Sequence, residues 1–258
     1  MLFGVCCSID QAEIAKKTGF DYFECTLSSV GQMTDEEFSV FKQKIDTLDF
    51  YPLAMNVMLP GTFRLTGDEA DHETPLHFLE KAYSRAAAVK TESIVFGSAG
   101  ARNLPEGFTD VKRAYDQLES FAAQAGDLAK QNNIKLAIEP LSFRESNIIN
   151  LVSEAMYLAE RVNHPNVKIL ADYYHMVCNK DSVSAIRAFG QSLEHCHIAE
   201  AKSRAYPAPS DGQDYSPFFL ALKDAGYQGK VSLEAGDDRP FEEAVRTSFD
   251  YLKQYFES

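Results

Sequence analysis

Short apolar runs and amphipathic segments alternate along the whole chain. Eight runs, rich in Val, Ile, Leu, Ala and Phe, are short enough to be strands that are covered on both faces. Between them, apolar residues recur every three or four positions, which predicts helices. The predicted strands lie at 2–8, 22–27, 52–58, 93–99, 135–141, 168–173, 195–200 and 230–235. The predicted helices lie near 9–19, 35–48, 74–90, 109–132, 150–162, 181–190, 215–225 and 239–256.

This alternation predicts an α/β fold of the (β/α)8 TIM barrel class. Eight strand–helix pairs in 258 residues match the usual size of that barrel. A doubly wound open sheet is the alternative, but the turn after the first run reads CSIDQA and lacks the glycines of a dinucleotide-binding turn. No Gly/Ser linker or low-complexity stretch divides the chain, so we expect one barrel domain over residues 1–258.

Four apolar runs in the second half of the chain end in residues that can bind a divalent metal. They carry Glu139, Asp172, His197 and Glu234 at or near their carboxyl ends. Burying a carboxylate or an imidazole among apolar residues is costly unless the group is paired or bound to an ion. In a barrel the carboxyl ends of the strands open on the face that carries the active site. We therefore expect these four side chains to converge on one metal site.

Further polar residues accompany this set. His175 follows Asp172 by three positions, so it should reach the same rim, where it could bind the metal, donate a proton or hold a substrate hydroxyl. His195 and His197 face the same side of their strand. We expect His197, nearer the rim, to bind the metal and His195 to support it. Glu145, in the loop that follows the fifth strand, could contact a substrate hydroxyl or face solvent.

The chemistry of the set favours proton transfer beside a carbonyl group. One Asp, one His and two Glu suit Mn²⁺, Mg²⁺, Co²⁺ or Zn²⁺, and the ligands alone do not choose among these ions. Mn²⁺ is our first expectation. Glu139 and Glu234 belong to strands on opposite sides of the predicted barrel mouth. Such a pair can remove a proton from one carbon and return one elsewhere, while the metal steadies the enediolate oxygens. This is the chemistry of a ketose epimerase or an aldose–ketose isomerase, with Glu139 and Glu234 as catalytic residues.

The order and spacing of these motifs resemble the xylose isomerase-like TIM barrel superfamily. The closest group contains sugar isomerases and epimerases, among them ketose 3-epimerases and hydroxypyruvate isomerase. The resemblance is best from the fifth strand onward. The motifs that carry it are IEPL at 138–141, DYYHM at 172–176, HCHIAE at 195–200 and LEAG at 233–236.

The resemblance implies a role for each matching residue. It implies that the metal ligands are Glu139, Asp172, His197 and Glu234, and that the two glutamates exchange the proton. It also implies substrate contacts by Glu145, His175 and Arg204, with Lys202 as a second candidate for the arginine. Relatives of this kind often associate, so a homodimer or a homotetramer is expected.

The resemblance weakens where the pocket should take its shape. The segment 207–215 reads PAPSDGQDY, with one glycine where the family often has a glycine-bounded loop. The loop after the last strand, GDDRPFEE at 236–243, is rich in negative charge, whereas barrel phosphate sites use glycine-rich backbone and a helix start there. We therefore expect a non-phosphorylated sugar, a cyclitol or a small hydroxy-ketone as the substrate.

Three other function classes compete with the epimerase interpretation. A lyase or dehydratase of a keto-sugar or inosose would use the same metal and the same first proton removal. An AP endonuclease-like DNA-repair enzyme would need further histidines on the early strands and a late D-x-H motif, but residues 211–213 read DGQ. A barrel that only binds sugar is opposed by the intact set of four ligands.

Composition narrows the partners and the compartment. A formal net charge of −13 repels polyanions, so we expect no nucleic acid partner. No apolar stretch approaches the roughly 20 residues that span a bilayer, so no membrane partner is expected. The first residues, MLFGVCCSID, lack the basic region of a signal peptide. Five cysteines without a CxxC spacing fit a reducing compartment, and we expect a cytoplasmic protein.

Overall fold

The computed structural model describes residues 1–236 and 238–257, and its strands form the predicted closed barrel. The strands are parallel, each pairs with its neighbour in the sequence, and the first closes the ring against the last. They are β1 (Leu2–Cys6), β2 (Tyr22–Thr26), β3 (Ala54–Asn56), β4 (Ser93–Phe96), β5 (Lys135–Ile138), β6 (Val167–Asp172), β7 (Leu193–Ile198) and β8 (Lys230–Leu233).

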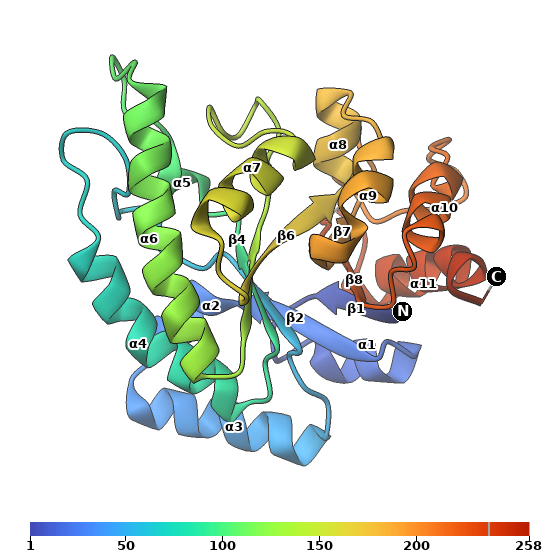
Figure 1. Ribbon diagram of the computed structural model, residues 1–258. Coiled ribbons are helices and arrows are strands. Elements are labelled where there is room, and N and C mark those ends of the chain that lie inside the picture. Colours follow the sequence, from blue (N-terminus) through green and yellow to red (C-terminus); the bar gives the residue numbers. More distant parts are fainter. Residues whose placement is uncertain (237, 258) are drawn as a thin grey trace.

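Helices surround the barrel and connect its strands (Figure 1). The last helix contacts the first, so the outer ring closes as the sheet does. The helices are α1 (Ala12–Thr18), α2 (Leu27–Gln32), α3 (Asp35–Leu48), α4 (Glu73–Ala88), α5 (Ala99–Arg102), α6 (Val111–Gln131), α7 (Val152–Val162), α8 (Tyr173–Asn179), α9 (Ser184–Phe189) with the 3-10 turn η1 (Gly190–Ser192), α10 (Ser216–Asp224) and α11 (Phe241–Glu257).

Three short helices, α2, α5 and α8, were not predicted. Each begins at the last residue of a predicted strand, namely Leu27, Ala99 and Tyr173. The error has a simple cause, because helices of four to seven residues are too short to show a helical period in the sequence. Predicted strands were therefore too long at the carboxyl ends, where the chain leaves the barrel and builds the site.

The start of α3 shows how a local sequence sets a boundary. Thr34 precedes the helix and its side-chain oxygen accepts a hydrogen bond from the backbone N–H of Glu37, at 3.2 Å. The Glu37 carboxylate in turn accepts from the backbone N–H of Thr34, at 2.8 Å. This capping box satisfies two backbone donors that the first turn leaves unpaired.

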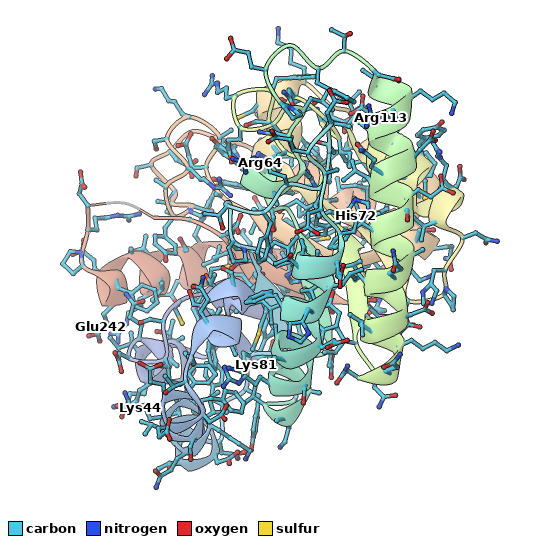
Figure 2. All side chains as sticks on the ribbon, turned by 90° about the vertical axis from the view of Figure 1, so that its left-hand side faces the viewer. Lys44, Arg64, His72, Lys81, Arg113 and Glu242 are labelled. Carbon is cyan, nitrogen blue, oxygen red and sulfur yellow. The ribbon has the colours of Figure 1, made fainter. Side chains whose placement is uncertain are left out.

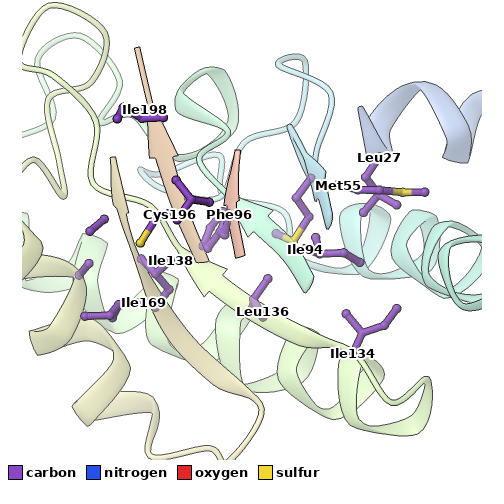
Figure 3. Packing of buried hydrophobic residues seen from close by; sticks show 14 of the residues in the cluster. Leu27, Met55, Ile94, Phe96, Ile134, Leu136, Ile138, Ile169, Cys196 and Ile198 are labelled. Carbon is purple, nitrogen blue, oxygen red and sulfur yellow. The ribbon is translucent and has the colours of Figure 1, made fainter. Parts of the chain in front are cut away.

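Alternate residues of each strand face opposite ways, and this divides the interior into two parts. Apolar side chains such as Met55, Ile94 and Ile169 pack in the large core between the barrel and its helices (Figure 3). Inside the barrel, Val95, Ala137 and Leu170 form a small separate apolar cluster. The rest of the barrel interior carries polar side chains, and it is these that build the site.

One glycine makes room for a large ring in the barrel interior. A Cβ at Gly4 would lie 2.3 Å from the ring of Tyr22, which is closer than real atoms approach. The Tyr22 ring therefore fills the space that a side chain on β1 would otherwise take. Its hydroxyl is hydrogen-bonded to Ser232 Oγ on β8 at 2.8 Å, so the ring ties two strands together below the site.

Candidate metal and active site

The four residues expected to bind a metal come together at the carboxyl end of the barrel. Glu139 and Glu234 follow β5 and β8 directly, Asp172 ends β6, and His197 lies next to the end of β7. One ligand atom from each lies within 4.8 Å of the others. Barrel closure thus joins groups that are far apart in the sequence, and a cation at this point would meet three carboxylates and one imidazole.

Asp172 serves both the helix that follows it and the site. Its Oδ1 accepts hydrogen bonds from the backbone N–H groups of Tyr174, at 2.7 Å, and His175, at 3.3 Å, and so caps α8. The other oxygen, Oδ2, lies 3.5 Å from Nε2 of His175. Asp172 is therefore the N-cap of α8, and His175, three positions later, lies in the first turn of the helix. It fixes both side chains against the same rim.

His175 presents one hydrogen-bond donor to the site. Its Nδ1 accepts a hydrogen bond from the backbone N–H of Ser142, at 3.0 Å. In the neutral ring the proton must then be on Nε2. That nitrogen is buried and has no hydrogen-bond partner among the described residues. A buried donor without a partner is costly, so this nitrogen is available for an oxygen of a bound molecule.

Glu139 is held by His197 on one side and fits against Gly97 on the other. Its Oε1 lies 3.0 Å from Nδ1 of His197. A Cβ at Gly97 would lie 1.7 Å from Oε2, so only glycine leaves room for this carboxylate. Burial opposes ionisation of Glu139, but the hydrogen bond and the charge of His197 outweigh burial and lower the pKa of the carboxyl.

Glu234 has the same chemistry in a different environment. Asn56 Nδ2 donates to its Oε1 at 3.0 Å, and Arg204 donates to its Oε2. The amide of Asn56 is oriented by Thr26, whose hydroxyl donates to Oδ1 at 3.3 Å. Burial, with the nearby Glu139 charge added, raises the pKa of Glu234 to about 7 against the opposing effect of His197. The pKa values of the two glutamates thus shift in opposite directions.

Arg204 and Glu145 form the rim above the metal ligands. Nη1 of Arg204 lies 3.1 Å from Oε2 of Glu145, and the guanidinium lies over the Tyr174 ring at 4.8 Å. Glu145 Oε1 accepts a hydrogen bond from Ser142 Oγ at 3.0 Å. Lys202, the second candidate for the arginine, is exposed. The structure therefore brings Arg204 and Glu145 to the site together with His175.

Two residues of the site were missed in the sequence. Glu24 on β2 is fully buried and lies between His195 and His197, while Asn56 on β3 orients Glu234. Glu24 stands inside the apolar run YFECTL, which is the same signal that identified Glu139. It was overlooked because the resemblance was strongest from the fifth strand onward. Asn56 gave no signal beyond an amide at the end of a short run.

A cavity of about 390 Å³ adjoins the site beside β1, β2 and β3. It shares Glu24 and Asn56 with the site, and its other walls include the thiols of Cys6 and Cys25 and the ring of Phe41. Its volume lies within the range of small-molecule sites. The cavity touches the site through Glu24 and Asn56, and its walls contain none of the four proposed metal ligands.

Two cations on the surface are paired with acidic residues. Lys44 and Arg113 lie in different parts of the face in Figure 2 and form ion pairs with Asp10 and Asp68. This face therefore shows mixed charge rather than the basic surface that polyanion binding needs. Within the described residues, we find no helix whose length and hydropathy would suit a bilayer crossing.

The chain is similar in sequence and in fold to known proteins. The family model for the xylose isomerase-like TIM barrel matches residues 12–255. D-psicose 3-epimerase of Agrobacterium fabrum is 27% identical over 228 residues, covering 86% of this chain and 77% of the relative. The probable ketose 3-epimerase of Synechocystis is 29% identical over 229 residues, covering 86% and 76%. A crystal structure of D-psicose 3-epimerase in the presence of D-fructose has the same fold, with a TM-score of 0.87 at 22% identity and full coverage of both chains.

Proposed function

The chain belongs to the xylose isomerase-like TIM barrel family, and from this membership we propose that it is a metal-dependent epimerase or isomerase of a non-phosphorylated ketose. Relatives that align along most of the chain are named as ketose 3-epimerases. The observation that carries the proposal is the approach of the Glu139, Asp172, His197 and Glu234 ligand atoms to within 4.8 Å of one another.

The donor set fits a divalent cation. Glu139 and Asp172 are buried carboxylates, and Glu234 is nearly so. Like charges this close in a buried place are costly unless a cation compensates them. An oxygen-rich shell with one imidazole supports Mn²⁺ as the resident ion, with Mg²⁺, Co²⁺ and Zn²⁺ as alternatives. When bound, such an ion supplies a positive charge that polarises a carbonyl and stabilises the negative charge that develops on substrate oxygens.

The two glutamates divide the proton transfer between them. One carboxylate removes the proton from the carbon beside the carbonyl, and that C–H bond breaks. The other, protonated, delivers its proton to the opposite face of the same carbon, and a new C–H bond forms with inverted configuration. His175 donates from Nε2 to a substrate oxygen, while Arg204 and Glu145 hold hydroxyl groups at the rim.

Local charge supports a substrate without phosphate. Arg204 is already engaged by the carboxylates of Glu145 and Glu234, so it is not free to bind a dianion. The segment 236–243 is acidic, although its Asp237 lies outside the described residues. A neighbour of the same fold was crystallised in the presence of D-fructose. Calorimetric titration with ketohexoses and their phosphates tests the point, and tighter binding of the phosphates would contradict it.

Proton exchange with solvent is the direct test of the function. The Mn²⁺-loaded protein is incubated in D₂O with a panel of ketoses, including D-fructose and D-psicose, and with inosose. We expect an epimer that carries one deuterium at the inverted carbon, with the mass otherwise unchanged. A product lighter by one water would instead establish the lyase alternative. Absence of exchange with every member of the panel would contradict the proposed chemistry.

The proposed setting of the enzyme is cytoplasmic. All five cysteines of the chain are free thiols, which fits a reducing compartment. The homodimer or homotetramer stays a prediction, and light scattering on the purified protein measures it.

A further inference from the structure

A chain of polar groups lies buried beneath the proposed metal site. Glu24 Oε1 lies 3.0 Å from Nε2 of His197, and Glu24 Oε2 lies 2.8 Å from Nε2 of His195. His195 Nε2 lies 3.4 Å from Ser232 Oγ, and this oxygen is hydrogen-bonded to the Tyr22 hydroxyl at 2.8 Å. All five side chains have no solvent exposure. The chain thus runs from a predicted metal ligand down into the barrel interior, away from the substrate.

The hydrogen bonds of Glu24 decide which nitrogen of His197 is free. An ionised carboxylate only accepts hydrogen bonds, so the Nε2 atom of His197 must carry the proton between them. Nδ1 is then the nitrogen that can give up its proton to a bound ion, whereas without an ion it hydrogen-bonds to Glu139 Oε1. It is also the one turned toward the other ligands, 3.0 Å from Glu139 Oε1 and 3.5 Å from Glu234 Oε2.

We propose that Glu24 is a positioning residue that fixes the ring orientation and the tautomer of His197 so that Nδ1 binds the metal ion. The inference rests on the metal site of the proposed function. A carboxylate behind a ligating imidazole holds the ring in place and makes the ligating nitrogen more basic. Here both oxygens of the carboxylate are used, because His195 holds the second one. Glu24 cannot rotate without breaking a bond to a buried imidazole.

A second ion held by Glu24, His195 and His197 is the rival interpretation, since these three also offer ligand atoms within 4.8 Å of one another. The distances favour the hydrogen-bonded arrangement. Each carboxylate oxygen faces one imidazole nitrogen, at 3.0 and 2.8 Å, which are ordinary N–H···O lengths. The metal content of the loaded protein decides between the two, and two ions per chain would overturn the proposal.

The affinity of the protein for Mn²⁺ is the principal test. Metal-free wild type, Glu24→Gln and Tyr22→Phe are titrated with Mn²⁺ in a calorimeter. Tyr22 is the matched control, because it lies on the same strand, is equally buried and ends the same polar chain. We expect Glu24→Gln to weaken Mn²⁺ binding by about 10- to 100-fold, as the loss of such a partner typically does. Tyr22→Phe should stay within about twofold of wild type.

The outcomes separate this inference from the proposed function. If wild type binds no divalent ion, both are overturned. If wild type binds Mn²⁺ and Glu24→Gln binds it equally well, only the role of Glu24 fails. If both variants weaken binding alike, the effect is general loosening of the interior, and the proposal fails as well. Thermal unfolding of the metal-free proteins accompanies each titration to show that the variants are folded.

The tautomer itself is open to measurement in the wild-type protein, even if Glu24→Gln does not fold. Protein with ¹⁵N-labelled histidine and loaded with Zn²⁺ is studied by long-range proton–nitrogen NMR. We expect His197 to show a protonated Nε2 and a metal-bound Nδ1. A metal-bound Nε2 would overturn the proposal. Glu24→Asp, which keeps the charge but shortens the reach, should lie between wild type and Glu24→Gln in Mn²⁺ affinity.

Discussion

The charged groups at the two ends of the barrel differ in how far they are paired with one another. At the amino end, Lys230 Nζ lies 3.0 Å from Glu92 Oε2 and 3.6 Å from Glu194 Oε1, and Ser93 Oγ donates to Glu194 at 2.6 Å. At the carboxyl end, five carboxylates gather around three imidazoles and the guanidinium of Arg204, and Nε2 of His175 has no hydrogen-bond partner among the described residues.

The difference shows what each end is for. At the amino end, Lys230, Glu194 and Ser93 pair with one another, so this cluster contributes to stability. The carboxyl end holds an excess of negative charge and an unpartnered donor, a state that costs free energy until an ion and a substrate supply what is missing. In barrels of this kind, the amino-terminal face contributes to stability and the carboxyl-terminal face carries the chemistry.

The largest expected effect is that of removing either catalytic carboxylate. Glu139→Gln and Glu234→Gln should each lower kcat for epimerisation by about 10²- to 10⁴-fold, because one proton transfer is lost. The free energy of unfolding of the metal-free protein should not fall in Glu234→Gln, because burial disfavours that charge, whereas Glu139→Gln should lose a stabilising contact with His197. Steady-state kinetics, metal analysis and denaturant unfolding measure these quantities. A variant that keeps its Mn²⁺ and its full kcat would remove that glutamate from the mechanism.

The second-largest effect is expected for Gly97→Ala, which should lower kcat by about 10²-fold. The new Cβ would meet Glu139 Oε2 at 1.7 Å, so the carboxylate must move, and misplacement of a catalytic group by about 1 Å costs this much. The matched control is Gly236→Ala, because a Cβ there meets no heavy atom within 4 Å. Equal activity of the two variants would show that the position of the Glu139 carboxylate is not critical.

Arg204→Lys should cost about tenfold in kcat/KM, because one ammonium cannot replace two guanidinium contacts to Glu145 and Glu234. Lys202→Ala, in the same loop, should stay within about twofold, as exposed side chains without partners contribute little. The kcat/KM values of the two variants are measured with the same ketose under identical conditions. A larger effect at Lys202 would reverse the assignment of the cationic rim.

The smallest effect on activity is expected at the amino end. Lys230→Met should lower the free energy of unfolding by about 1 kcal/mol, because the partly buried carboxylate of Glu194 loses its cation. The value of kcat per folded molecule should stay unchanged, since the substitution lies at the opposite end of the barrel from the site. Denaturant titration measures the free energy of unfolding. Steady-state kinetics, divided by the concentration of active enzyme, gives kcat per folded molecule. A fall in kcat without a fall in stability would abolish the distinction between the two ends.

The fold and most of the ligand set could be predicted because their signals are local. Each apolar run that ends in an acid or a histidine predicts both a strand and a metal-binding side chain at its carboxyl end. Glu24 carried the same signal in YFECTL and could have been found. Asn56 could not, because its partner Glu234 is 178 positions away and nothing near Asn56 requires an acceptor.

The sequence by itself determined the order of strands and helices and the types of ligand, because strand and helix periods, caps and buried polar residues are set by near neighbours. Only the tertiary structure decided that Glu24 faces two histidines and that Gly97 must lack a side chain. It also decided that chemically equal glutamates differ, Glu139 with a lowered pKa and Glu234 with one of about 7. The physical reason is that these properties depend on distances across a closed barrel, and closure joins residues that the chain keeps far apart.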